Sequence, residues 1–115
     1  MQKEYPITKT DALSNDECLE FQLYKNHRPY YAFLVKNQDE FYAYANSCPH
    51  QGRMLQWMPN TFLTKDKKRI MCGAHGATFA IETGLCDAGP CVGANLLALP
   101  VRIEKKIVFV THADE

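Results

Sequence analysis

Short runs of apolar side chains, separated by polar turns, recur along the whole chain and predict β-strands. Residues 18–23 alternate between apolar and polar side chains, which is typical of a half-buried strand. Residues 30–35 are continuously apolar and aromatic, which is typical of a buried strand. The polar segment 36–40 and the apolar segment 41–45 then predict a hairpin with it.

The same pattern continues towards both ends of the chain. Residues 5–9 predict a short first strand, and residues 78–81 predict another strand later in the chain. Residues 101–104 and 107–110 alternate about a pair of lysines and predict a closing hairpin. The polar tail that follows contains His112, which we expect at the surface.

These short strands with regular turns predict an all-β fold, an antiparallel β-sandwich or barrel-like body. At 115 residues the chain has the length of one domain, which would span residues 1–115. Its apolar fraction of 46% and charged fraction of 23% are ordinary for a globular protein.

Charge and hydropathy exclude several classes of partner. Thirteen basic residues balance thirteen acidic ones, so the net charge does not favour binding to nucleic acid or to an anionic membrane. No stretch approaches the roughly 20 apolar residues of a membrane span, and the first residues lack a signal-peptide pattern. We therefore expect a cytoplasmic protein with no nucleic-acid or membrane partner.

Two pairs of metal-ligand residues stand out against this background. Cys48 and His50 have the spacing Cys-x-His, Cys72 and His75 have the spacing Cys-x-x-His, and glycine follows each pair. Thiolate and imidazole together select zinc, copper or iron–sulfur, not magnesium or calcium. The first pair follows a predicted strand, so we expect it on a loop, where sites usually lie.

Two kinds of metal site compete for these four residues. A structural zinc site usually takes Cys with Cys and His with His along the chain. Here each segment supplies one of each, which suits a two-iron centre in which one iron takes both cysteines and the other takes both histidines.

The complete double motif, Cys-x-His-x-Gly with Cys-x-x-His-Gly, resembles that of the Rieske 2Fe-2S family. The resemblance extends through Phe79 and the Thr83-Gly84 turn, and it covers nearly the whole chain from about residue 30. It implies a Rieske-type 2Fe-2S cluster on Cys48, His50, Cys72 and His75. These loops would form a small cluster-binding subdomain, residues 46–80, inserted into the sandwich.

Three positions distinguish types within the family. The respiratory-chain type has two further cysteines that form a disulfide between the loops, and a serine after the second His-Gly. Here those positions hold Arg53, Ala74 and Ala77. The resemblance therefore implies a ferredoxin-type centre, with a potential near about −150 mV and not near about +300 mV.

The resemblance implies an electron carrier and not a complete enzyme. We expect a soluble Rieske-type ferredoxin that passes electrons from a reductase to an oxygenase or another terminal enzyme. Two alternatives remain open: a small electron-transfer subunit of a reductase complex, like the nitrite reductase small subunit, and a redox or iron sensor. A Rieske oxygenase needs a second, mononuclear iron site, and the two unassigned histidines, His27 and His112, look peripheral.

An apolar run follows the first ligand pair. One interpretation is that Met54, Leu55, Trp57 and Met58 cover the metal centre and the core. The other is that they form a docking surface for a redox partner, because methionine and aromatic residues are enriched at interfaces. The sequence leaves both interpretations open.

Three cysteines remain after the ligands are assigned. Cys18 fits a small core residue on its strand. Cys86 and Cys91 lie five residues apart in a Gly/Pro-rich loop, where a disulfide is sterically possible and free thiols are favoured in a reducing compartment. In the family the proline of this loop lies against the cluster, so Pro90 is expected to form a third wall.

Overall fold

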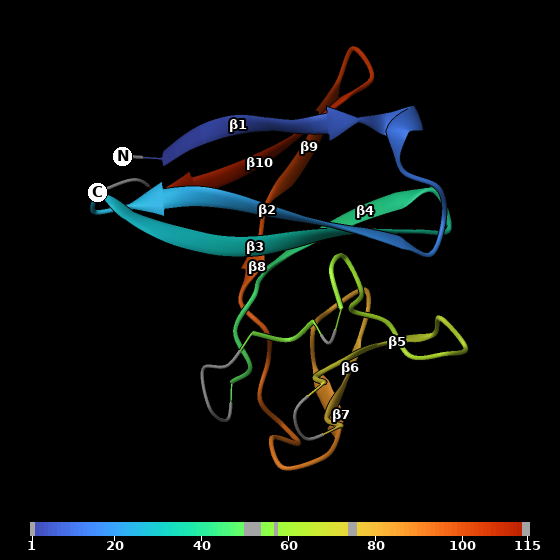
Figure 1. The fold of residues 1–115 in the computed structure, drawn as a ribbon. Helices are drawn as coiled ribbons and strands as arrows, with labels where there is room; N and C mark the ends of the chain where they lie inside the picture. Colours follow the sequence, from blue (N-terminus) through green and yellow to red (C-terminus); the bar gives the residue numbers. More distant parts are fainter. Residues whose placement is uncertain (1, 50–53, 57, 74–75, 114–115) are drawn as a thin grey trace.

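Three antiparallel sheets make up the fold (Figure 1). The structure is a computed structural model, and it describes residues 2–49, 54–56, 58–73 and 76–113. Within these residues the only helical element is a short 3-10 turn, η1 (Thr10–Ala12), and no helix is long and apolar enough to cross a membrane. The all-β prediction is confirmed. The strands are β1 (Gln2–Lys9), β2 (Glu17–Lys25), β3 (Arg28–Asn37), β4 (Glu40–Ala45), β5 (Arg69–Met71), β6 (Thr78–Ala80), β7 (Cys86–Ala88), β8 (Ala98–Leu99), β9 (Val101–Glu104) and β10 (Ile107–Ala113).

Two of the sheets form the sandwich. One has the strand order β1-β10-β9, and the other has the order β2-β3-β4-β8. Their facing side chains form a shared core that includes Leu34 of β3, Leu99 of β8 and Val108 of β10. The N-terminal strand pairs with the C-terminal one, from Gln2 opposite Ala113 to Lys9 opposite Ile107, so both ends of the described chain belong to one sheet.

Tight two-residue turns connect the hairpins. The central residues of the β2–β3 turn, Asn26 and His27, both have positive φ, as do those of the β3–β4 turn and the Lys105-Lys106 turn. Positive φ at both central positions is the pattern whose twist matches that of the flanking strands. The predicted hairpins are confirmed, and their strands are longer than the apolar pattern indicated because polar residues at the ends also pair.

The third sheet, β5-β6-β7, lies beyond β8 at the opposite end from β1 and β10 (Figure 1). Its first two strands flank the second ligand loop, with Met71 opposite Thr78. The strand β7 falls inside the stretch expected to be a Gly/Pro-rich loop, because three residues are too few to show a period. Residues 60–64 make only isolated bridges, among them Leu63 opposite Ile70.

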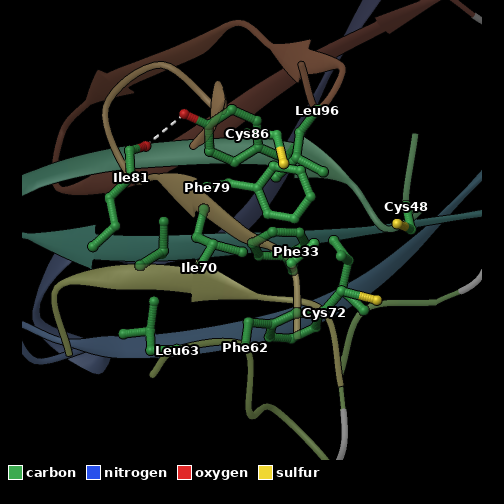
Figure 2. Close-up of a cluster of buried hydrophobic side chains, with 14 of the residues drawn as sticks. Phe33, Cys48, Phe62, Leu63, Ile70, Cys72, Phe79, Ile81, Cys86 and Leu96 are labelled. Atoms are coloured by element: carbon green, nitrogen blue, oxygen red, sulfur yellow. Dashed lines mark hydrogen bonds between the residues drawn. The ribbon is translucent and has the colours of Figure 1, made fainter. Parts of the chain in front are cut away.

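A second core joins the third sheet to the sandwich. Phe33 and Tyr44 project from the face of the four-stranded sheet that points away from β10. Phe33 stacks on Phe62 with 4.1 Å between ring centroids, and the Tyr44 hydroxyl donates a hydrogen bond to the carbonyl oxygen of Ile81 at 2.5 Å. The ligand loops therefore extend from a body that is packed against β3 and β4 (Figure 2).

His112 is not a surface residue, which corrects the prediction. The strand β10 continues to Ala113, and His112 is only 5% exposed. Its ring lies against Tyr30 of β3, with 4.2 Å between centroids. The polar tail pairs with β1, so the edge that looked solvated from the sequence is covered. His27 is exposed in the β2–β3 turn, as expected.

Replacement of Phe62 by alanine tests the second core. We expect Phe62→Ala to lower the free energy of unfolding by about 3–5 kcal/mol, because it removes a fully buried ring stacked on Phe33. Urea unfolding measures this change. The control is Met58→Ala, at a residue 52% exposed, which we expect to change stability by no more than about 0.5 kcal/mol. Equal losses in the two variants would contradict the packing.

Candidate metal centre

The structure brings the two candidate cysteine ligands to one end of the second core. Cys48 follows the exit of β4, and Cys72 follows β5. Both are buried in the same cluster of apolar side chains, and Figure 2 shows their sulfur atoms at the same end of it. Both are free thiols. The other two candidate ligands, His50 and His75, lie outside the described residues.

The second ligand loop is held by its own backbone. The amide of Cys72 donates to the carbonyl of Ala77 at 2.8 Å, and the amide of Gly76 donates to the carbonyl of Cys72 at 2.9 Å. Gly76 has a φ of +70°, a conformation that glycine adopts without strain. The glycine of the Cys-x-x-His-Gly motif therefore closes a tight turn around the ligand positions.

One backbone hydrogen bond joins the two ligand loops. The amide of Gly73, directly after the second cysteine, donates to the carbonyl of Leu55 at 2.9 Å. Leu55 is itself fully buried in the second core. The spacing between the loops is thereby set by a residue whose side chain is fixed in the hydrophobic interior.

Asn46 closes the base of the first ligand loop. Its Oδ1 accepts a hydrogen bond from the amide of Leu55 at 2.7 Å, and its Nδ2 donates to Oε1 of Gln56 at 2.7 Å. Its own amide donates to the carbonyl of Tyr31, so the same residue is anchored on β3. This role of Asn46 was not predicted from the sequence. The signal that could have indicated it is an asparagine that immediately precedes a ligand loop, a residue type that bonds the local backbone.

This amide network continues into β2. Nε2 of Gln56 donates to Oε1 of Glu20 at 3.1 Å, and the amide of Glu20 donates to Oδ1 of Asn60 at 2.8 Å. The amide of Asn60 donates back to the Glu20 carboxylate. The segment after the first ligand loop is therefore tied to two strands of the sandwich by side-chain hydrogen bonds.

A third loop, residues 86–94, packs against the second ligand loop. A Cβ placed on Gly89 would lie 2.7 Å from Cα of Ala77, so only glycine allows this approach. The strand β7 that begins the loop is held by Asp87, which contacts Thr78 of β6 and Arg69 of β5. The hydrogen bond from Thr78, reinforced by Arg69, lowers the pKa of the Asp87 carboxyl. That Pro90 forms a wall against the cluster remains a prediction.

Cys86 and Cys91 sit on this third loop as free thiols. Their sulfur atoms are 3.0 Å apart, and Sγ of Cys86 also donates to the carbonyl of Ala88 at 3.3 Å. Burial, together with the neighbouring Cys86 and Cys48, raises the pKa of the Cys91 thiol to about 12. Cys91 is thus a protonated thiol beside a candidate ligand. Cys18, as expected, is a core residue in a different part of the same cluster.

The apolar run after the first ligand pair divides between the two interpretations. Met54 and Met58 are exposed, so they remain available to a partner. Leu55 is fully buried, and its inclusion in a docking surface is therefore wrong. Its amide and carbonyl both serve the ligand loops, which requires it to face inwards. Trp57 lies outside the described residues.

The donor set fits a cluster that takes two thiolates. Two unbridged, buried cysteines at one end of an apolar core supply the soft ligands that iron–sulfur centres use. Within the described ranges no group of three or more His, Cys, Asp or Glu side chains could hold a metal ion. A full ligand set on these loops therefore requires His50 and His75, which complete the motif in the sequence.

The side-chain hydrogen bonds of Asn46 give the first prediction for the site. We expect Asn46→Ala to lower the free energy of unfolding by about 1–3 kcal/mol, because it leaves the buried amide of Leu55 without its acceptor. The iron content of the purified protein should fall as well, because the first ligand loop loses its closure. Urea unfolding and a colorimetric iron assay measure the two effects.

The matched control is Asn37→Ala, which removes an amide that is hydrogen-bonded to Asp16 at an exposed position. This variant should keep its iron and lose at most about 0.5 kcal/mol. Unchanged stability and iron content in Asn46→Ala would show that the hydrogen bonds of Asn46 do not hold the first ligand loop.

Two glycines of the third loop test its contact with the second ligand loop. Gly89 and Gly93 have φ of +99° and +93°, but only a Cβ on Gly89 would collide with Ala77. Both alanine variants should carry similar backbone strain, and Gly89→Ala should lose a further amount of about 1–3 kcal/mol from the collision. Thermal unfolding of both variants measures the difference. Equal melting temperatures would contradict the close approach.

Two known proteins are similar to this chain in sequence. Apoptosis-inducing factor 3 of Homo sapiens is 36% identical over 82 residues, which are 71% of this chain and 13% of that protein. The Mus musculus protein of the same name is 33% identical over 82 residues, with the same two shares. The chain therefore spans only a small part of the length of these relatives.

Solved structures share the fold at low sequence identity. The ferredoxin of carbazole 1,9a-dioxygenase from Nocardioides aromaticivorans superposes with a TM-score of 0.72 and 21% identity, covering 98% of this chain and 99% of that chain. A chain in a complex of reduced oxygenase and oxidised ferredoxin of carbazole 1,9a-dioxygenase has a TM-score of 0.75 and 19% identity, with 97% and 95% covered. The terminal oxygenase of carbazole 1,9a-dioxygenase from Novosphingobium sp. has a TM-score of 0.76 and 24% identity, covering 93% of this chain and 29% of the oxygenase chain.

The family model named Rieske [2Fe-2S] domain matches residues 3–108, which include both ligand loops and every strand apart from Gln2 of β1 and residues 109–113 of β10. The cofactor that this family binds is a Rieske-type 2Fe-2S cluster with cysteine and histidine ligands. With the double motif complete and its two cysteines placed at one end of a common core, the chain belongs to the Rieske 2Fe-2S domain family.

Proposed function

We propose that this protein is a one-electron carrier whose cluster is held by Cys48 and Cys72 on one iron and by His50 and His75 on the other. The observation that carries this proposal is the placement of the two buried thiols at one end of the second core, within a family match that contains both motifs. We place a single domain over residues 1–115, with the cluster-binding part at 46–80 and the strand β7 packed on it.

When bound, the cluster supplies a one-electron redox step. The chain's own residues determine how readily that step occurs. Cys48 and Cys72 lie among buried apolar side chains such as Leu55 and Phe79. An added negative charge is costly in such a low-dielectric setting, so the protein favours the oxidised state. The position after the second His-Gly holds Ala77, which has no hydroxyl to donate to the cluster.

The role that fits best is a ferredoxin that carries electrons from a reductase to an oxygenase or another terminal enzyme. Its support is the end-to-end superposition with the ferredoxin of carbazole 1,9a-dioxygenase from Nocardioides aromaticivorans, and the similar superposition with a chain from a complex of oxygenase and ferredoxin in carbazole 1,9a-dioxygenase. The chain's other histidines do not converge on a second iron site, because His27 is exposed in a turn and His112 is packed against Tyr30. We place the protein in the cytoplasm.

A second candidate is an electron-transfer subunit of a reductase complex. It is favoured by the relatives in which the matching segment is 13% of a longer protein. The two roles differ in assembly: a carrier purifies alone, whereas a subunit copurifies with a large partner in a fixed ratio. Affinity purification of the tagged protein from its own cells, followed by size-exclusion chromatography, separates them. A sensor would instead change its partner binding when the cluster is lost.

Electron paramagnetic resonance before and after dithionite tests the cluster. We expect a signal only after reduction, with the low average g of a two-iron centre that has histidine ligands, and about two iron atoms per chain. Cys72→Ala should abolish the signal, and Cys18→Ala, which changes a core cysteine, should keep it. One zinc per chain and no signal would overturn the proposal.

The reduction potential is the second test. We expect a midpoint near the low end of the Rieske range, about −150 mV, because the site is apolar and lacks the serine and the interloop cysteines of the respiratory type. Protein-film voltammetry measures it. A midpoint well above zero would show that other groups stabilise the reduced cluster.

A further inference from the structure

Cys86 and Cys91 form a pair that the electron-transfer role does not use. Their sulfur atoms are 3.0 Å apart, and both side chains are buried in the second core. A disulfide has a sulfur–sulfur distance of about 2.0 Å, so closing the bond requires a movement of about 1 Å. The remaining non-ligand cysteine, Cys18, lies on β2 and has no such partner among the described cysteines.

The backbone of the third loop holds the two sulfur atoms together. The amide of Cys86 donates to the carbonyl of Ala94 at 2.8 Å, and the amide of Gly93 donates back to the carbonyl of Cys86 at 3.2 Å. The amide of Ala94 donates to the carbonyl of Cys91 at 2.9 Å. Because both ends of the loop are fixed by hydrogen bonds, the two thiols are already oriented for bond formation.

The pair lies beneath an exposed turn of the chain. Cys91 is flanked in the chain by Pro90 and Val92, which are both exposed, and Val92 is 64% exposed. Because Cys91 itself is buried, a disulfide can reach it only if this turn moves outwards. Cys86 lies deeper, at the start of β7.

We propose that Cys86 and Cys91 are a thiol–disulfide exchange site for low-molecular-weight disulfides of the glutathione class. In the first step the Cys91 thiol, exposed by the outward movement of its turn, gives its proton to water, and its sulfur bonds to one sulfur of the glutathione disulfide. One glutathione leaves as a thiolate and takes up a proton. In the second step the Cys86 sulfur bonds to Cys91, and the other glutathione leaves. The two cysteines together lose two electrons and two protons, and the glutathione disulfide gains them.

The exchange acts on the proposed cluster through two contacts, and this part rests on the proposed function. The Cys91 thiol lies beside Cys48, and Gly89 of the same loop touches Ala77 of the second ligand loop. A thiol can donate a hydrogen bond towards a ligand sulfur, and a disulfide cannot. Since hydrogen bonds to the sulfurs help to set the potential of a cluster, the disulfide form should have the more negative midpoint.

The test uses the iron-loaded protein without oxygen in buffers of set glutathione to glutathione disulfide ratio. Samples are quenched with acid, alkylated with N-ethylmaleimide and analysed by intact mass and peptide mapping, with iron measured on each sample. We expect a Cys86–Cys91 disulfide at high disulfide ratio, reversed by glutathione, while the iron content stays constant. Cys18→Ser should behave like the wild type, Cys91→Ser should form no disulfide, and Cys86→Ser should stop as a glutathione adduct on Cys91.

Full alkylation of both cysteines in the wild type at every ratio, with iron retained, would overturn the exchange site. A disulfide that forms only after iron is lost, or that includes Cys48 or Cys72, would overturn it too. A protein without iron would refute the proposed function, but the mapping of Cys86 and Cys91 still decides the exchange. An unchanged midpoint in the fully oxidised pair would overturn its link to the cluster.

Discussion

The centre of the four-stranded sheet, along β3 and β4, is buried on both faces, and the rest of the molecule is arranged around that constraint. Successive side chains of β3 point in opposite directions, so Leu34 enters the sandwich core and Phe33 enters the core beneath the ligand loops. Both cores depend on the backbone of this one sheet. A strand that serves two interiors at once tolerates no polar residue along 32–35, which explains its unbroken apolar run.

The candidate metal centre is rigid because its ligand loops are attached to this shared sheet. The first ligand loop leaves β4 at Asn46, whose side chain binds the returning chain at Leu55. The second loop then binds Leu55 through Gly73. Two loops that are separate in the sequence thus converge on one buried leucine. Such a site suits electron transfer, because a centre whose atoms move little upon reduction has a low reorganisation energy.

Much of the fold follows from local sequence patterns. The hairpins are predictable because apolar runs alternate with polar turns, and the four candidate ligands stand out in the sequence because few residue types bind iron. The errors concern pairing across the chain. His112 looked solvated until β10 paired with β1, and the sequence left Leu55 open between the core and a docking surface until the structure placed it in the core. The role of Asn46 was equally hidden, because an asparagine at a strand exit is common and its partner is nine residues away.

The pairing of the first and last strands has a consequence for how this domain combines with others. Gln2 lies opposite Ala113, so the chain enters and leaves at neighbouring points, on the side away from the third sheet and the ligand loops (Figure 1). Such a unit can be inserted into a longer polypeptide, or circularly permuted, without covering its working end. The same geometry allows the domain to occur as one segment of much longer proteins, with its ligand loops left uncovered by the attached chain.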